Sequence, residues 1–326
     1  MTPASASPER KALCLTPTFG TTTSEAERLL TDRGVELVRA DADDASSIRL
    51  LSDAAALIVG TQKVDTTMLS RGPQLKIVAK HGAGTDNIDI RAAEARGVVV
   101  TNAAIANALA VAEFAIAAML ALARGIVSSD ALLRLGTWTP RTGRQLDGST
   151  AGIIGLGAIG KLVAVRANAL GMRVVYYDLV PPTASPRANE WERLPLDEVL
   201  ALADFLTIHV PLSDTTRKMV GTAELARMKP TAYLVNLSRG GIVDEAALAA
   251  ALAGGRLAGA ALDVFEQEPV PRRSPLLHVP AMILTPHMAG YTEESLAAMS
   301  IAVAESVVAA LDGEDPPGRV TAADPR

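Results

Sequence analysis

Three glycines with the spacing Gly-x-Gly-x-x-Gly directly follow an apolar stretch and have the chemistry of a phosphate-binding turn. Gly155 allows a tight turn, Gly157 lets the main chain approach a pyrophosphate, and Gly160 lets the following helix pack on the strand. The first two residues of that helix, Ala158 and Ile159, would present N–H groups and the positive end of the helix dipole to the phosphates. The pattern therefore predicts a dinucleotide-binding site.

The next apolar stretch ends in an acidic residue, Asp178, which lies 18 residues after Gly160. A carboxylate at this position accepts hydrogen bonds from the ribose hydroxyls of the adenosine and repels a 2′-phosphate. The residues that follow, Leu179–Pro182, include no arginine that could bind such a phosphate. We therefore expect NAD rather than NADP. The alternative is that Asp178 is a solvated acid at the end of a strand.

Elements that could position these residues recur along the chain, because short apolar runs alternate with helical patterns. The first series extends from Lys11–Thr16 to Val98–Thr101, and the second from Ala151–Ile154 to Ile283–Thr285. Strands separated by helices of about ten residues form parallel sheets, and near-continuous apolar strands are typical of sheets buried on both faces. We therefore predict an α/β fold with two doubly wound parallel-sheet domains.

Two further helices and a tail complete the predicted elements. A long apolar helix, Asn107–Arg124, lies between the two series, and a last helix, Glu293–Leu311, has Thr292 as its expected N-cap. The polar, proline-rich tail Gly313–Arg319 is expected to be loose.

The composition argues against several classes of protein. The 326 residues include 31 basic and 36 acidic side chains, a net charge of −5 that gives no electrostatic footprint for nucleic acid. The single cysteine, Cys14, can form neither an intramolecular disulfide nor a cysteine zinc cluster. Met1–Arg10 lacks the pattern of a signal peptide, and Ala108–Ala123, interrupted by Glu113, is shorter than the roughly 20 apolar residues that cross a bilayer. We expect a cytoplasmic protein without a metal, nucleic-acid or membrane site.

Three longer motifs add a family resemblance. In chain order they read Asn236-Leu-Ser-Arg-Gly-Gly-Ile-Val-Asp-Glu245, Ala261-Leu-Asp-Val-Phe-Glu-Gln-Glu-Pro269 and Thr285-Pro-His-Met-Ala-Gly290. Together with the glycine motif, they resemble in order and spacing the D-isomer-specific 2-hydroxyacid dehydrogenases, which include 3-phosphoglycerate dehydrogenase and glyoxylate/hydroxypyruvate reductase. The resemblance implies an NAD-dependent enzyme that interconverts a small D-2-hydroxy acid and its 2-oxo acid by hydride transfer.

The resemblance implies catalytic roles for three residues. Arg239 would bind the carboxylate and carbonyl oxygen of a 2-oxo acid through its permanently charged guanidinium group. His287 would act as general acid/base at that carbonyl oxygen, and Glu268 would hydrogen-bond the other ring nitrogen and fix its tautomer. Each residue has a plainer alternative when it is considered alone. Arg239 could cap the end of a strand, His287 could be a turn residue, and Glu268 could be a solvated acid in a loop.

The resemblance also implies contacts for the cofactor and the substrate. Val210 and Pro211 would pack on the adenine side. Leu237, Ser238 and Asp263 would border the nicotinamide, and the segment from His287 to Gly290 would close that side. A glycine-rich loop would bind the substrate carboxylate through main-chain N–H groups; it comprises Lys80, His81, Gly82, Ala83 and Gly84.

Two departures from the family bear on the substrate. Gly60 stands where phosphoglycerate dehydrogenases usually carry an arginine that helps to bind the substrate phosphate. A chain of this length is also expected to lack the C-terminal regulatory domain of many such enzymes. Both weaken 3-phosphoglycerate as the substrate, although Lys80, His81 and Lys63 could still bind a distal anion.

The resemblance further implies a discontinuous arrangement of domains. A flavodoxin-like substrate domain would comprise residues 1–104 and 291–326, and a Rossmann NAD-binding domain residues 105–290. The protein would form a homodimer in which the helix Asn107–Arg124 packs across a two-fold axis. The alternative is that this helix is internal to its domain.

Two other functions are considered from the sequence. An NAD(H)-sensing binding protein of the same family is an alternative to the enzyme. A hydrolase is not expected, because the chain has neither a Gly-x-Ser-x-Gly turn nor a His-Glu-x-x-His motif.

Overall fold

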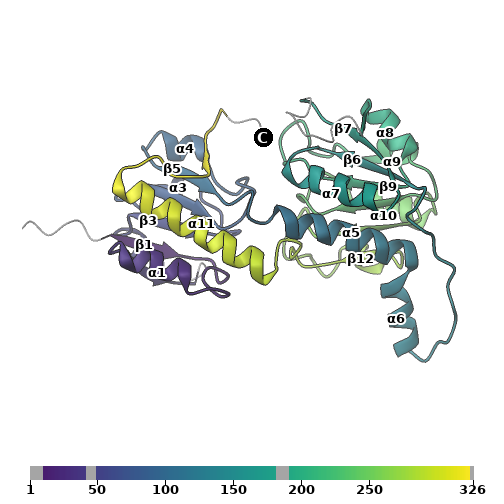
Figure 1. Ribbon diagram of the computed structural model, residues 1–326, viewed down its shortest axis with the longest axis horizontal. Coiled ribbons are helices and arrows are strands. Elements are labelled where there is room, and N and C mark those ends of the chain that lie inside the picture. Colours follow the sequence, from purple (N-terminus) through teal and green to yellow (C-terminus); the bar gives the residue numbers. More distant parts are fainter. Residues whose placement is uncertain (1–9, 42–48, 181–190, 324–326) are drawn as a thin grey trace, which may run out of the picture. The chain divides into compact units, whose positions relative to one another are not determined.

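A computed structural model of the chain describes residues 10–41, 49–180 and 191–323. Its residues form two compact units, shown in Figure 1. Unit 1 comprises the chain up to Asn107 together with Tyr291–Pro325, and unit 2 comprises Ala108–Gly290.

The sheet of unit 1 has the strand order β13-β5-β4-β3-β1-β2, and its strands β1 to β5 are parallel. Without β13 this is the doubly wound order 2-1-3-4-5 of flavodoxin-like folds. The strands are β1 (Lys11–Cys14), β2 (Glu36–Arg39), β3 (Ala56–Val59), β4 (Ile77–Lys80), β5 (Val99–Asn102) and β13 (Arg319–Val320).

Helices cover both faces of this sheet. One face packs on α1 (Glu25–Asp32) and α11 (Glu293–Asp312), and the other on α3 (Thr66–Ser70) and α4 (Ile90–Glu94). Since both faces are covered, β3 and β4 are buried along their whole length, which explains their continuous apolar sequences. Thr292 caps α11 as predicted, because its side chain accepts a hydrogen bond from the Ser295 N–H at 3.1 Å.

The C-terminal tail is ordered, and the expectation that it is loose is wrong. β13 pairs antiparallel with β5, and the Gly318 carbonyl accepts the Asn102 N–H at 2.9 Å. The Pro317 carbonyl accepts the Ser306 hydroxyl of α11 at 2.9 Å. The edge of a sheet offers unpaired main-chain groups, so even a short polar segment can be held there.

The sheet of unit 2 has the order β12-β11-β10-β9-β6-β7-β8, and every pair is parallel. This is the order of a Rossmann fold, with one more strand at its end. The strands are β6 (Thr150–Ile154), β7 (Arg173–Tyr177), β8 (Glu192–Arg193), β9 (Phe205–Ile208), β10 (Tyr233–Asn236), β11 (Gly259–Leu262) and β12 (Met282–Leu284). The predicted fold class, two doubly wound parallel sheets, is confirmed.

Two helical layers enclose the sheet of unit 2. One core cluster joins the sheet to α5 (Ala108–Arg124) and α7 (Ala158–Ala169). The other joins it to three helices and a short 3-10 turn: α8 (Leu196–Leu202), α9 (Thr222–Arg227), α10 (Glu245–Ala253) and Pro275–His278.

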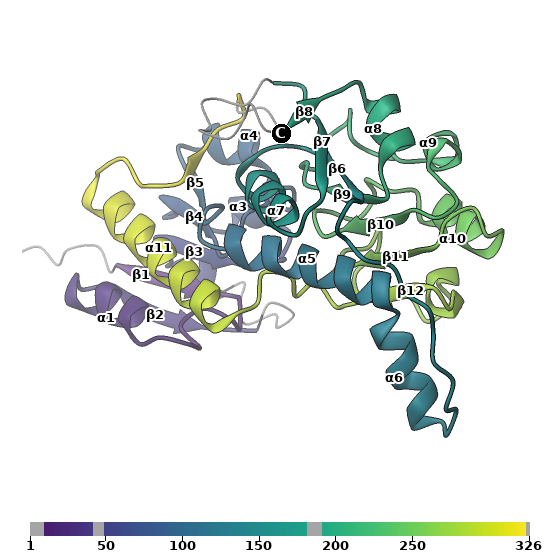
Figure 2. The same cartoon turned by 45° about the vertical axis from the view of Figure 1, so that its right-hand side comes forward.

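Helix α6 (Ile126–Arg134) follows α5 but extends away from the rest of unit 2, as Figures 1 and 2 show. Helix α5 buries nine of its residues and contacts α7, β10 and β11. It is therefore internal to unit 2 along much of its length. Helix α6 has no buried residue.

Among the residues that the structure describes, two helical segments are long and apolar enough to cross a membrane by length and composition: α11, and α5 together with α6. Both α11 and α5 supply buried side chains to the cores of their own units. Their apolar sequences are therefore accounted for by packing within the protein.

Candidate active site at the carboxyl end of the second sheet

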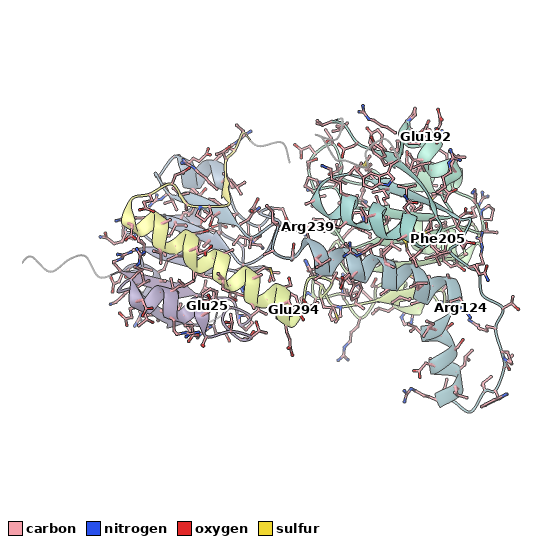
Figure 3. The ribbon with its side chains drawn as sticks, viewed as in Figure 1. Glu25, Arg124, Glu192, Phe205, Arg239 and Glu294 are labelled. Atoms are coloured by element: carbon pink, nitrogen blue, oxygen red, sulfur yellow. The ribbon has the colours of Figure 1, made fainter. Side chains whose placement is uncertain are left out.

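The candidate residues of unit 2 lie where its parallel strands end. Gly155 follows β6, Asp178 follows β7, Leu237 follows β10 and Asp263 follows β11. The strand order reverses between β6 and β9, and open α/β sheets bind ligands beyond such a reversal. In Figure 3, Arg239 and Phe205 mark opposite ends of this sheet: Arg239 follows β10, and Phe205 begins β9.

Each glycine of the motif has a separate structural reason. Gly155 has φ of +92°, and a Cβ there would lie 2.6 Å from the His209 carbonyl oxygen. A Cβ at Gly160 would lie 2.1 Å from the Gly155 carbonyl oxygen, so only glycine lets α7 approach the turn this closely. Gly157, the N-cap of α7, has open space around its Cβ position. A turn with one open side before a helix N-terminus fits a pyrophosphate.

The Asp178 carboxylate is oriented by two main-chain groups. Its oxygens accept the Leu156 N–H at 2.7 Å and the Val180 N–H at 3.0 Å. A carboxylate oxygen can accept more than one hydrogen bond, so both retain capacity for ribose hydroxyls. The residues therefore fit the adenosine half of NAD.

An arginine that the sequence analysis missed lies beside Asp178. The Arg193 guanidinium group, from β8, donates to the carbonyls of Asp178 at 2.8 Å and Leu179 at 3.2 Å. Pairing of β8 with β7 brings Arg193 to this position, and a two-residue polar strand gave no periodic signal. Pro181 and Pro182, which complete the segment expected to lack an arginine, lie outside the described residues.

The turn after β9 lies against the glycine motif. The Cγ1 atom of Val210 is 2.7 Å from the Cβ position of Gly155, whereas Pro211 is exposed. His209 Nε2 is 2.9 Å from the Thr207 hydroxyl, and burial lowers the pKa of His209 to about 3. This histidine is therefore neutral near neutral pH.

His287 and Glu268 form a hydrogen-bonded pair. The Nδ1 atom of His287 lies 2.7 Å from Oε2 of Glu268, and Oε1 of Glu268 accepts the Phe265 N–H at 3.0 Å. Burial by itself would raise the pKa of Glu268. The hydrogen bond and charge of His287, the Phe265 N–H and the charge of Arg239 outweigh it and hold that pKa below its usual value. The carboxylate is thus ionised at neutral pH.

The turn that carries His287 is built on Asp263. The carboxylate of Asp263 accepts the Thr285 hydroxyl at 2.6 Å and the N–H groups of Met288 at 2.9 Å and Ala289 at 2.7 Å. Its carbonyl accepts the His287 N–H at 2.8 Å. These bonds hold His287 at φ of +52°, a region that costs a non-glycine residue about 1–3 kcal/mol.

Asp263 itself is only 1% exposed. Its described contacts support the His287 turn, and its expected position beside the nicotinamide stays a prediction. Gly290 ends unit 2 directly after this turn.

Arg239 lies in a turn that packs closely on the segment preceding Glu268. A Cβ at Gly240 would lie 1.8 Å from the Phe265 carbonyl oxygen. The Arg239 carbonyl accepts the Asn236 side-chain amide at 3.0 Å, and its guanidinium donates to the Ser238 carbonyl at 2.6 Å. Leu237 is buried, and the Ser238 hydroxyl bonds to the Ile208 carbonyl, which ties the ends of β10 and β9 together. The structure therefore brings all three expected catalytic residues to one end of the sheet.

In unit 1, the expected substrate loop follows β4. The Lys80 ammonium group is buried and donates to the Gly60 carbonyl and, at 2.9 Å, to the Asn87 side chain. Both ring nitrogens of His81 lie within hydrogen-bond distance of hydroxyl groups. Both side chains thus already have internal partners, and their suggested binding of a distal anion stays a prediction. Lys63 is exposed and lies 3.4 Å from Asp65.

The main-chain groups of this loop are only partly used in internal hydrogen bonds. Gly82, at φ of +150°, donates to the Lys80 carbonyl and accepts the Ala103 N–H. The Ala83 carbonyl accepts the Asn102 side-chain amide at 2.7 Å. Within the described ranges, the N–H groups of Ala83 and Gly84 have no recorded hydrogen-bond acceptor.

Comparison with known proteins places the chain in a family. Residues 116–289 match the model of the D-isomer specific 2-hydroxyacid dehydrogenase NAD-binding domain. A glyoxylate reductase of Korarchaeum cryptofilum is 41% identical over 280 residues, which cover 84% of each chain. A D-3-phosphoglycerate dehydrogenase of Mycobacterium bovis is 44% identical over 271 residues, but these cover 82% of this chain and only 51% of the relative.

A solved structure extends the comparison to the whole fold. The D-lactate dehydrogenase of Aquifex aeolicus, complexed with NAD and lactic acid, superposes with a TM-score of 0.83 at 27% identity and covers 94% of this chain and 96% of that one. The resemblance inferred from the motifs and the expected NAD cofactor are confirmed. The chain therefore belongs to the D-isomer specific 2-hydroxyacid dehydrogenase family and is an NAD-dependent oxidoreductase that interconverts D-2-hydroxy acids and 2-oxo acids.

Proposed function

We propose that Arg239, Glu268 and His287 carry out the reduction of a small 2-oxo acid that has no charged group besides its carboxylate, such as glyoxylate or hydroxypyruvate. The observation that carries the proposal is the 2.7 Å bond between His287 and Glu268 on a turn held by Asp263. A constrained imidazole with an ionised partner has the properties of a general acid/base.

The protein's part in the reaction is to bind, orient and protonate. Bound NADH supplies the hydride that C2 accepts. Glu268 accepts the Nδ1 proton of His287, so the Nε2 proton is directed toward the substrate carbonyl oxygen and is transferred to it as C2 is reduced. Arg239 holds the carboxylate and the carbonyl oxygen and stabilises the negative charge that develops there. In the oxidative direction His287 accepts the hydroxyl proton.

The cofactor would be held by the residues at the ends of the unit 2 strands. Gly155, Gly157 and Gly160, with the N–H groups of Ala158 and Ile159, would bind the pyrophosphate. Asp178 would bind the ribose, and Val210 and Pro211 the adenine. The remaining residues would border the nicotinamide: Leu237, Ser238, Asp263 and Gly290. The open Gly157 turn and the residual acceptor capacity of Asp178 support these roles.

For the loop of unit 1, we propose that the N–H groups of Ala83 and Gly84 are carboxylate-binding groups. Main-chain N–H groups in such a turn bind anions without a side chain. An uncharged C3 substituent is favoured by Gly60, where a Cβ would lie 2.9 Å from the Thr16 hydroxyl oxygen, so the site has no arginine and little room for one. The 44% identity to a phosphoglycerate dehydrogenase makes 3-phosphohydroxypyruvate the second candidate.

The test follows NADH oxidation by its absorbance with glyoxylate, hydroxypyruvate, pyruvate and 3-phosphohydroxypyruvate. We expect the highest kcat/KM with glyoxylate or hydroxypyruvate and a large loss in His287→Asn. A preference for the phosphorylated acid would overturn the substrate proposal. NADH binding without turnover of any acid would favour the NAD(H)-sensing alternative, and absence of binding would contradict the cofactor site.

A homodimer is the proposed assembly, and α6 supports it. Large apolar side chains are exposed on α6 and the segment after it, and contiguous exposed apolar surface marks interaction sites. They are Ile126, Val127, Leu133, Leu135 and Trp138, the last two more than 80% exposed. Because α5 is largely internal, we place the contact on α6 rather than on α5. Light scattering should give a dimer for the wild type and a monomer for the pair Leu135→Ser and Trp138→Ser. A cytoplasmic location is proposed with it.

A further inference from the structure

His81 is buried in unit 1, and each of its two ring nitrogens has a hydrogen-bond partner. Its Nε2 atom lies 3.0 Å from the Ser300 hydroxyl of α11, and its Nδ1 atom lies 3.1 Å from the Thr18 hydroxyl after β1. The residue is 7% exposed, and the edge of its ring contacts the Phe19 ring, with centroids 6.0 Å apart. Ser300 is fully buried and lies 219 residues from His81 in the sequence.

The surrounding hydroxyls determine which ring nitrogen carries the proton. Ser300 donates its only hydroxyl proton to the Leu296 carbonyl at 2.7 Å and accepts the Gly20 N–H at 3.0 Å. Toward His81, the Ser300 oxygen can therefore only accept, so Nε2 must be protonated.

The direction of the hydrogen bond at Nδ1 follows from this assignment. A neutral ring protonated at Nε2 has a lone pair at Nδ1, which accepts the Thr18 hydroxyl proton. The Thr18 oxygen in turn accepts the hydroxyl proton of Thr16 at 3.0 Å. The hydrogen bonds therefore all run in one direction: Thr16 donates to Thr18, Thr18 donates to His81, and His81 donates to Ser300.

We propose that His81 is a positioning residue for the substrate: its neutral, Nε2-protonated ring anchors the Ala83 and Gly84 N–H groups to α11 and to the loop after β1. The proposal rests on the proposed binding of the substrate carboxylate by those N–H groups. His81 directly precedes Gly82, which has φ of +150°. Without the contacts of the His81 ring, only main-chain hydrogen bonds would hold the loop in this conformation. The ring adds two long-range attachments at the start of the loop.

The surroundings keep the ring neutral. Burial lowers the pKa of His81 to about 4; the Leu296 carbonyl opposes this effect, and the charge of Lys80 adds to it. The groups that face the ring are Thr18 and Phe19 from the loop after β1, and Ser300 and Leu296 from α11. Within the described residues, Lys80 is the charged group recorded as acting on it.

The first part of the test measures kinetics of Ser300→Ala, His81→Phe and His81→Gln. Loss of either attachment should raise KM for the 2-oxo acid about tenfold, the loss of roughly one hydrogen bond in substrate binding, with kcat and the Kd of NADH nearly unchanged. His81→Gln retains an N–H donor toward Ser300 and should recover part of the affinity. His278→Phe, at an exposed histidine of unit 2, is the matched control.

The second part uses nitrogen-15 NMR of the histidine rings and needs no activity. The His81 signal, assigned by its loss in His81→Gln, should show a neutral ring protonated at Nε2 from pH 7 down to pH 5. An Nδ1-protonated ring, titration near pH 6.5, or an unchanged KM in folded His81→Phe and Ser300→Ala would each overturn the inference. If the wild type reduces no 2-oxo acid, the proposed function fails, and the NMR result still decides the state of the ring.

Discussion

At the carboxyl end of the unit 2 sheet, side chains remain partly open to solvent, whereas at the carboxyl end of the unit 1 sheet they turn inward. His287 exposes 37% of its side chain and shares one nitrogen with Glu268, while His81 is 7% exposed and uses both ring nitrogens internally. Arg239 and Lys80 differ in the same way, because Lys80 is buried among carbonyl and amide oxygens.

The difference shows how one type of sheet can serve two purposes. A buried polar group must find internal partners, and those partners remove it from ligand chemistry. In unit 1 the side chains of Lys80 and His81 have such partners, and recognition by main-chain N–H groups is what we propose there. In unit 2 buried Asp263 fixes the turn through main-chain N–H groups, and the His287 ring on that turn is the group to which we assign proton transfer.

The largest effect is expected when the positive charge of Arg239 in unit 2 is removed. Arg239→Ala should lower kcat/KM by about a thousandfold, because charge-assisted bonds to the carboxylate and carbonyl oxygen are both lost. Arg239→Lys keeps the charge without the two-pronged geometry and should lose less. Steady-state kinetics measure both, with Arg227→Ala on the exposed surface of α9 as control. Equal kcat/KM in Arg239→Ala and wild type would remove Arg239 from the site.

Acid should destabilise unit 1 through His81. The pKa of its ring is 6.5 when unfolded and about 4 when folded, so the unfolded chain binds more protons between these values. The contribution to stability is therefore complete above about pH 6.5, is lost as the pH falls toward 4, and amounts to about 3 kcal/mol. Urea unfolding at several pH values should show that the free energy of unfolding falls with falling pH in the wild type and falls less steeply in His81→Gln. The same slope in both proteins would exclude His81 as its source.

Asp263→Asn tests what the buried carboxylate does. The amide would direct N–H groups at one or more main-chain donors, so we expect a loss of about 2 kcal/mol in stability and a lower kcat. Thermal unfolding and kinetics separate this role from cofactor binding. A normal kcat with a raised Kd for NADH would show instead that Asp263 acts directly on the cofactor.

A smaller effect is expected at the adenosine end. Asp178→Ala should raise KM for NADH about tenfold and lower KM for NADPH, because repulsion of a 2′-phosphate is lost while Arg193 remains beside it. The double variant with Arg193→Ala should lose the gain for NADPH. If NADPH use does not improve in Asp178→Ala, Arg193 does not reach the phosphate.

Much of the fold could be predicted because it rests on local patterns. Continuous apolar strands, the glycine motif and the Thr292 cap are each specified within a few residues. The position of the His287–Glu268 pair could be predicted only by resemblance, because the residues are 19 apart and meet through two turns.

Features that depend on distant partners were not predictable. The state of His81 is decided by Ser300, 219 residues away, and Arg193 reaches Asp178 through a two-residue strand. The tail is held by pairing with β5 and by Ser306 rather than by its own sequence. Such contacts leave no periodicity in the sequence.

The role of His287 as proton donor can be measured by single-turnover oxidation of enzyme-bound NADH at a saturating concentration of the best 2-oxo acid, comparing wild type with His287→Asn. We expect a rate lower by about 10²–10⁴-fold in His287→Asn, with an unchanged Kd for NADH, because only the proton donor is lost. A rate within tenfold of the wild type would show that the proton comes from elsewhere and would contradict the division of work between the two sheet ends.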